Sequence, residues 1–213
     1  MSYDPRLLEL YAPWRTCRAC RLCDFRVRLI EGFGHARAPV MFVLDRLSVD
    51  DTAEARLSPD SPYLRIIWSF VTEAGKNPTD YWYTPSVACP TLRISGQEYG
   101  LETTPLPQRG DMTACRPRLH AEVGIVEPEI IVACGPNAAK AVMQTGAPSV
   151  QYGLGGLVEA QIAGEYGAYP VPLMLVRSPH ELYTHRDLTE GGTWHTTSQF
   201  IAEAIRIAEQ LRG

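Results

Sequence analysis

The sequence predicts an α/β fold, a three-layer αβα sandwich in which helices cover both faces of a mostly parallel central sheet. Three observations support this prediction. Short apolar runs alternate along the chain with segments of helical periodicity. The length of 213 residues suits a single domain, here taken as residues 1–213, and 45% hydrophobic with 21% charged residues is ordinary for a globular protein. No internal repeat or low-complexity tract breaks this order.

The first half of the chain is predicted to begin with a helix and then to alternate strand and helix. Asp4 is a suitable N-cap with Pro5 at the first helical position, and Gly75 is a suitable C-cap for the next helix. Strands are expected where apolar, aromatic or β-branched residues run together, and loops where polar residues, glycine and proline gather. The expected helices are 4–12 and 63–75, the strands 38–45 and 80–89, and the loops 48–62 and 90–110.

The second half is predicted to continue in the same way. Gly124 is expected to interrupt a helix that Pro128 ends, and Pro136 to start the next helix. The apolar segment before Pro136 predicts a buried strand, and the last residues of the chain predict an amphipathic helix. The expected helices are 112–128, 136–146 and 193–213, and the expected strands are 129–135, 152–161 and 169–180.

Composition narrows the class of function. The formal net charge of −4 argues against a protein that is basic all over, although it leaves room for a local basic face. No run of 18 apolar residues predicts a membrane span, and the N-terminal residues lack the apolar core of a secretory signal. A cytoplasmic location is therefore expected. The glycine-rich residues 152–156 lack the following Lys-Ser/Thr of a phosphate loop, so no nucleotide cofactor is expected.

Four of the six cysteines form a pattern that suits a metal. Cys17 and Cys20 form a C-x-x-C pair, whose spacing lets one turn of chain direct two sulfurs at one metal. A thioredoxin-like redox pair normally follows a strand, and no strand is predicted before this pair. Cys89 ends a predicted strand and Cys115 begins a predicted helix, so the four together fit either zinc or a cubane iron–sulfur cluster. Spacing alone does not separate these two metals.

The other two cysteines are expected to have no chemical role. Cys23 is left over beside the C-x-x-C pair, and Cys134 lies inside an apolar run that predicts a small buried side chain. The alternative for all six is that they are buried free thiols in a reducing compartment.

Positive charge gathers around the cysteines in two distant segments. A solvated helix face with ordinary salt bridges is the usual explanation for such charges. Their recurrence around the same residue type nevertheless favours an anion-binding patch. The basic residues concerned are Arg15, Arg18, Arg21, Arg26 and Arg28 in the first segment, and Arg109, Arg116, Arg118 and His120 around Cys115.

The order of segments resembles family 4 of the uracil-DNA glycosylases, the iron–sulfur branch of that superfamily, from about residue 15 to residue 186. The opening segment CRACRLCDFRVRLIEGFG is similar to the family's cysteine segment, and APVMFVLD to the strand before its first catalytic motif. IIWSFVTEAG, DYWYTPSVAC, ACRPRL, PEIIVACGPNAAKAV and LMLVRSPHEL then follow in the family's order.

The resemblance implies a cofactor and a substrate class. Cys17, Cys20, Cys89 and Cys115 would bind a 4Fe–4S cluster that pins the loops meeting DNA, with zinc as the alternative metal. The arginines between the cysteines would then contact DNA phosphates, and a late polar loop would lie near the minor groove. The DNA contacts expected in this way are Arg15, Arg18, Arg21, His185 and Arg186.

The catalytic motifs of the family are altered. Residues 44–48, LDRLS, stand where the family has a G-E-x-P-G motif that lets backbone approach the base, and only Asp45 keeps the acidic character. Pro85 stands where an Asn reads uracil, and Ser178 where a His supports the leaving base, with His180 two residues on. Tyr63 is the nearest candidate for the aromatic residue that stacks on the base.

Two hypotheses about function follow, and a third sets the resemblance aside. The first is a glycosylase-like protein without ordinary uracil excision, which binds nucleic acid or a protein partner as an accessory module in replication, repair or a phage-like machine. The second is an active base-excising enzyme with a re-made pocket, in which Asp45, Ser178 and His180 are the catalytic groups. The third is a zinc-clipped α/β protein of unrelated function. The residues 90–110, longer than the family's usual spacing, could carry a partner site.

Overall fold

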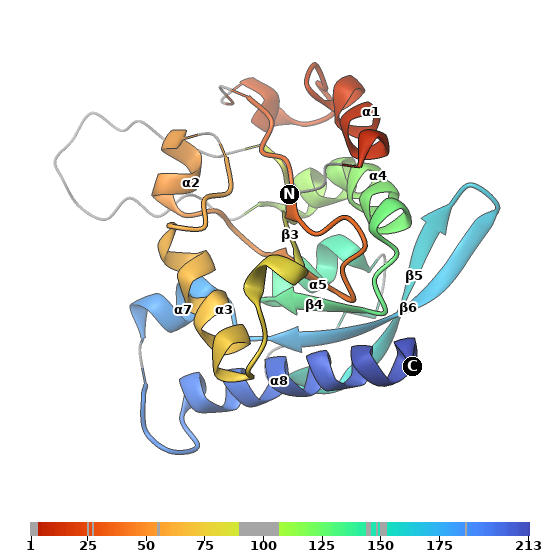
Figure 1. Cartoon of the computed structure of the whole chain (residues 1–213). Coiled ribbons are helices and arrows are strands. Elements are labelled where there is room, and N and C mark those ends of the chain that lie inside the picture. Colours follow the sequence, from red (N-terminus) through yellow and green to blue (C-terminus); the bar gives the residue numbers. More distant parts are fainter. Residues whose placement is uncertain are drawn as a thin grey trace, which may run out of the picture.

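In the computed structural model, one six-stranded sheet lies at the centre of the molecule with helices on both faces (Figure 1). The structure describes residues 4–24, 26, 28–54, 56–89, 107–143, 146–147, 149, 153–185 and 187–213. Most of the predicted loop 90–110 and the whole of Arg186 lie outside these residues. No helix in the described part of the chain is both long enough and apolar enough to cross a membrane.

The sheet is mostly parallel, as predicted. Its strand order is β1-β3-β2-β4-β6-β5, in which the four central strands run parallel and the two edge strands run antiparallel to their neighbours. The order reverses between β2 and β4, since the chain moves from β2 to one side and later from β4 to the other. The strands are β1 (Phe33–Gly34), β2 (Val40–Leu44), β3 (Trp82–Pro85), β4 (Ile130–Cys134), β5 (Leu157–Gly164) and β6 (Gly167–Val176).

Two apolar cores separate the sheet from its helices, which confirms the three-layer prediction. Residues alternate along β2 and β4, so that Met41 and Val43 enter one core while Phe42 and Leu44 enter the other. In Figure 1, α1 and α4 lie on one side of the strands and α8 on the other. The first core contains α1 (Pro5–Trp14), α4 (Arg109–Val126) and α5 (Pro136–Val142), and the second contains α3 (Pro62–Glu73), α7 (Pro179–Thr184) and α8 (Thr193–Arg212).

Some element boundaries differ from the predicted ones. The predicted loop 48–62 contains a short helix, α2 (Val49–Glu54), which Ser48 and Asp51 cap through reciprocal hydrogen bonds. The predicted strand 169–180 ends at Val176, and α7 follows it because Ser178 acts as N-cap and Pro179 is the first helical residue. Helix α4 also continues through Gly124 to Val126, where its predicted interruption does not occur.

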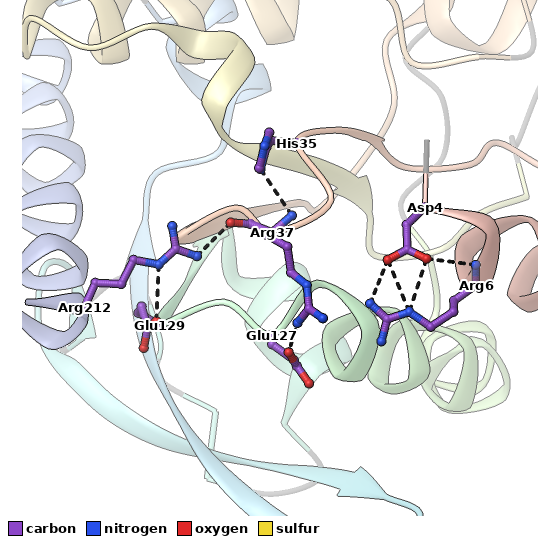
Figure 2. A network of polar contacts seen from close by, with 7 residues as sticks. All are labelled: Asp4, Arg6, His35, Arg37, Glu127, Glu129 and Arg212. Carbon is purple, nitrogen blue, oxygen red and sulfur yellow. Dashed lines mark hydrogen bonds and ion pairs between the residues drawn. The ribbon is translucent and has the colours of Figure 1, made fainter. Parts of the chain in front are cut away.

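Polar contacts join the C-terminal helix to the residues that precede β2 and β4, at the amino-terminal ends of these strands. Figure 2 shows Arg212 at the end of α8 donating to the backbone oxygen of Arg37 (2.7 Å) and pairing with Glu129. Arg37 in turn pairs with Glu127, which follows α4. Exposed pairs of this kind contribute only about 0–1 kcal/mol each to stability, so their role is to fix the local arrangement.

Candidate functional site

The parallel strands end in register, which brings the altered motif positions to one edge of the sheet. Leu44 pairs with Pro85 on one side and with Cys134 on the other, and Cys134 pairs with Val176. The residues that follow these strand ends therefore meet at the carboxyl edge, beside the point where the strand order reverses. In open α/β sheets, ligands usually bind at this position, outside the carboxyl ends of the strands where the strand order reverses.

Asp45 and Ser178 are brought together at this edge. Asp45 directly follows β2, and Ser178 follows β6 as the N-cap of α7. The Ser178 hydroxyl donates a hydrogen bond to Asp45 Oδ1 (2.7 Å) and accepts one from the His180 backbone N–H (3.3 Å). One serine therefore orients the carboxyl group and begins the helix that carries His180.

The Asp45 carboxyl group is enclosed by protein. Asp45 is 4% exposed, and its Oδ2 faces the backbone of Gly135, which follows β4. Gly135 has a φ of 107°, and a Cβ at this position would lie 2.3 Å from Asp45 Oδ2, so no larger residue fits there. Burial raises the pKa of Asp45 to about 6, although the Ser178 hydrogen bond and the nearby charge of Arg46 act in the opposite direction.

The raised pKa of Asp45 gives a testable dependence of stability on pH. Because the folded chain keeps this proton up to about pH 6 while the unfolded chain loses it near 3.8, stability falls as pH rises through that window. We expect Asp45→Asn, which still accepts from Ser178, to be more stable than wild type by about 1–3 kcal/mol at neutral pH and by much less near pH 4.

Guanidinium unfolding of both proteins across this pH range checks the expected change. Other titrating groups are common to the two proteins and cancel in the difference. A stability gap that stays constant or narrows as pH rises would contradict the burial of a protonatable Asp45 carboxyl group.

His180 and Tyr63 form the second polar pair at this edge. The Tyr63 hydroxyl lies 2.6 Å from His180 Nδ1, and the two rings pack edge to face. The hydrogen bond of the His180 ring to Tyr63 uses Nδ1 and not Nε2. Burial, followed by the charge of Arg46, lowers the pKa of His180, so the imidazole is neutral at pH 7.

Arg46 is a member of this site that the sequence did not single out. Its charge acts to lower the pKa values of Asp45, His180 and Tyr63, although burial raises those of Asp45 and Tyr63 overall. Its Nε is buried and has no hydrogen-bond partner among the described residues. Its position directly after Asp45, inside the altered motif, is a signal that could have identified it.

Pro85 is the last residue of the neighbouring strand β3, and its side chain has no hydrogen-bond donor or acceptor. It is buried at the end of β3, and its carbonyl accepts a hydrogen bond from Arg118 (2.7 Å). Arg118 also pairs with Glu122 (2.5 Å) inside the core, where neither side chain has any exposed surface. Glu122 further accepts hydrogen bonds from Tyr11, Trp82 and Thr84.

The four predicted metal-ligand cysteines surround one small cavity. Cys17 and Cys20 approach it from the segment after α1, Cys89 from the residues that directly follow β3, and Cys115 from the first half of α4. Trp14, Leu29 and Val87 are among the apolar residues that complete its wall. Cys23 and Cys134 do not line this cavity.

The thiols at this cavity are the ligand type that either zinc or an iron–sulfur cluster takes. A zinc ion needs every sulfur at about 2.3 Å from one point. Among the described residues, no three Cys, His, Asp or Glu side chains lie close enough together to hold one metal ion. Four cysteines from three segments of the chain line this one cavity, and thiolates are ligands of both zinc and iron–sulfur clusters.

Arg26 links the cysteine segments to one another. It donates to Cys89 Sγ (3.4 Å) and to the backbone oxygens of Trp14 (3.4 Å) and Arg15 (2.9 Å). Burial raises the pKa of the Cys89 thiol, and the Arg26 hydrogen bond partly offsets that rise. Arg26 is therefore placed to stabilise the thiolate form of Cys89 that a metal requires.

The arginines predicted to contact DNA differ in their surroundings. Arg15 pairs with Glu31 (2.9 Å) and Arg21 with Asp111 (3.0 Å), while Arg18 is exposed and has no ion pair with the described residues. His185 is exposed at the end of α7. The predicted basic cluster around Cys115 is partly wrong.

Two members of that second cluster belong to the core. Arg118 is 0% exposed and forms the ion pair with Glu122. His120 is 2% exposed and bonds the backbone of Val142 and Ala163. Both side chains lie on the inward face of α4, so only Arg109 and Arg116 remain at the surface of this cluster.

Comparison with known proteins supplies the family. A family model described as "Uracil DNA glycosylase superfamily" matches residues 57–206 of the 213 residues. The chain belongs to this superfamily. The match includes the ends of β3, β4 and β6, and therefore most of the carboxyl edge described above.

Two curated relatives are similar to this chain and carry the same description. The type-4 uracil-DNA glycosylase of Sulfurisphaera tokodaii is 26% identical over 132 residues, which cover 59% of this chain and 52% of that protein. The type-4 uracil-DNA glycosylase of Pyrobaculum aerophilum is 27% identical over 144 residues, 65% of each chain. The chain thus spans between half and two thirds of the length of these relatives. Both support the predicted resemblance to family 4.

Proposed function

We propose that this protein is an iron–sulfur, DNA-binding member of the superfamily that lacks ordinary uracil excision and serves as an accessory module in replication or repair. The observation that carries the proposal is the closed carboxyl edge. There the buried Asp45 carboxyl group is satisfied by Ser178 and packed against Gly135, and Pro85 presents no polar side chain.

The altered edge removes the groups that excision would use. By the family resemblance, backbone should approach the base where Leu44 and Ser48 now stand in place of glycines. An Asn should read the base at Pro85, and a His should support the leaving base at Ser178. Loss of one preorganised donor of this type typically costs a factor of about 10²–10³ in rate. The loss of several such groups at one edge favours binding without excision.

A 4Fe–4S cluster is the cofactor that the cysteine cavity supports. Cys17, Cys20, Cys89 and Cys115 would hold it, and its contribution when bound would be structural, as a rigid link between segments far apart in the sequence. Arg26 would hold Cys89 beside the segment leading to Cys17. Zinc remains the alternative metal for thiolate ligands.

DNA is the proposed ligand for two reasons. Both curated relatives are described as DNA glycosylases. The cysteine segment also presents the exposed Arg18, with no carboxylate partner among the described residues, and phosphate contacts by such cations are independent of sequence and sensitive to salt. A protein partner in replication or repair belongs to the same proposal.

A second candidate function is base excision with a re-made pocket. It is favoured by the two polar pairs at the edge, Asp45 with Ser178 and His180 with Tyr63, together with the buried Arg46 Nε that has no partner among the described residues. A carboxyl group with a pKa of about 6 can exchange a proton near neutral pH, as a general acid or base must. Such an enzyme would excise a base that is recognised without the Asn that the family uses to read uracil.

A binding titration tests the proposed function. Fluorescence anisotropy with single-stranded and duplex oligonucleotides should show binding by the anaerobically purified chain that weakens steeply with salt. Arg18→Gln should weaken binding and reduce the salt slope by about 1, while Arg206→Gln, which removes an exposed cation paired with Glu203 on α8, should change neither. Absence of DNA binding by the wild-type chain would overturn the proposal.

A further inference from the structure

A basic groove lies between α4 and α5, apart from the two polar pairs and the cysteine cavity. Its volume is about 480 Å³. Three cations line it, and no carboxylate is among the described residues of its wall. The lining residues that matter for charge are Arg109 and Arg116 from α4, and Asn137 and Lys140 from α5.

The cations of this groove are not neutralised by neighbouring acids. Arg116 donates to the backbone oxygens of Lys140 (2.9 Å), Ala141 (2.9 Å) and Met143 (3.2 Å), which fixes its guanidinium group at the C-terminal end of α5 without a carboxylate partner among the described residues. Arg109 and Lys140 are exposed and form no ion pair with the described residues. Burial, followed by the charge of Arg109, lowers the pKa of Arg116, as expected for cations that converge without an anion.

Several other cations on the described surface do have an acidic partner. Elsewhere on the described surface, cations such as Arg37, Lys76 and Arg206 each pair with a glutamate. Like charges that converge in one groove repel one another, and a bound anion relieves the repulsion. The groove therefore has the electrostatics of an anion site.

The groove is near the two sites already described, since residues of its two helices connect to both. Gly135, which contacts Asp45, precedes α5 by one residue, and Asn137 in its first turn lines the groove. On the other side, the ion pair between Arg21 and Asp111 joins the cysteine segment to the first turn of α4. A strand lying in the groove would reach from the cysteine segment toward the carboxyl edge of the sheet.

The remaining lining residues indicate which part of a nucleic acid would lie here. Pro107, Met112, Met143, Gly146 and Ala147 supply small or apolar surface. No aromatic side chain for stacking on a base is among the described lining residues. Such a surface suits sugar and phosphate rather than the bases.

We propose that the groove between α4 and α5 binds the phosphate backbone of a DNA strand, with Arg109, Arg116 and Lys140 as the phosphate contacts. The inference rests on the proposed function, because it assigns a path to the DNA that this function requires. It also adds contacts that lie outside the cysteine segment, from which DNA binding was first expected.

Lysine footprinting tests the proposal within one molecule. The chain has two lysines, Lys76 and Lys140, and Lys76 lies after α3, where it pairs with Glu209. Acetylation with and without a saturating oligonucleotide, followed by mass spectrometry, should show Lys140 protected several-fold and Lys76 unchanged. Equal acetylation of Lys140 in the DNA-bound and free protein would overturn the proposal.

Two further measurements separate the possible outcomes. Inorganic phosphate at the same phosphate concentration should protect Lys140 far less than DNA does; equal protection would identify a free-phosphate site and overturn the proposal. The double variant Arg109→Gln/Lys140→Gln should lower the slope of log K against log salt by about 1.4–1.8, and Lys76→Gln should leave it unchanged.

The outcomes distinguish this inference from the proposed function. Wild-type protein that binds no DNA would overturn both. Wild-type protein that binds DNA while the double variant keeps the same affinity and salt slope would overturn only the assignment of the groove.

Discussion

Glu122→Gln is expected to lower the free energy of unfolding by about 3–5 kcal/mol, because it leaves Arg118 as a buried charge without its counter-ion. Both side chains have no exposed surface, and Glu122 also accepts hydrogen bonds from Tyr11 and Trp82. The effect should extend to the site, since Arg118 holds the backbone oxygens of Pro85 and Ser86 at the end of β3. Guanidinium-induced unfolding measures the change.

An exposed pair on the C-terminal helix supplies the matched control. Glu203→Gln removes the partner of Arg206 at a position where both side chains are about half exposed, and it should change stability by less than about 1 kcal/mol. If Glu122→Gln cost no more than Glu203→Gln, the buried ion pair would have no structural role.

Cys89→Ala is expected to abolish the binding of iron and to destabilise the chain. Cys89 is one of the four cysteines that line the cavity. A bound cluster would link the residues after β3 to α4 through Cys89 and Cys115. Cys115→Ala should give the same result, since structural metal sites contribute their binding free energy to folding. Iron content and visible absorbance of anaerobically purified protein, followed by thermal unfolding, measure both effects.

Cys23→Ala is the control for this experiment. Cys23 lies three residues after Cys20 but does not line the cavity, so its removal should leave iron content unchanged. Equal iron loss in all three variants would place the ligands elsewhere, and full iron retention in Cys89→Ala would remove that cysteine from the ligand set.

The central part of the fold could be predicted from the sequence because local signals and tertiary burial agree there. The apolar run of β2 and the apolar run of β4 are strands buried on both faces, as parallel central strands are. The two missed helices carried capping signals that were not used. Ser48 with Asp51 is a capping box, and Ser178-Pro179 with Glu181 is a helix start.

The candidate site was predictable to the extent that strand ends define it. Asp45 and Ser178 follow apolar strands, and parallel strands bring their carboxyl ends to one edge. Tertiary partners could not be predicted in this way. Arg118 and Glu122 are charged residues on the buried face of α4, and only their pairing with each other and with β3 makes that burial possible.

The most direct test of the central claim is a single-turnover excision assay with the anaerobically purified, iron-bearing protein in excess over a uracil-containing oligonucleotide. Abasic sites would be counted on single-stranded and duplex DNA under conditions where anisotropy shows the oligonucleotide to be bound. The account predicts bound DNA with no uracil released above the protein-free control. Uracil release that Asp45→Asn abolishes would contradict it and establish the protein as an active glycosylase with a re-made pocket.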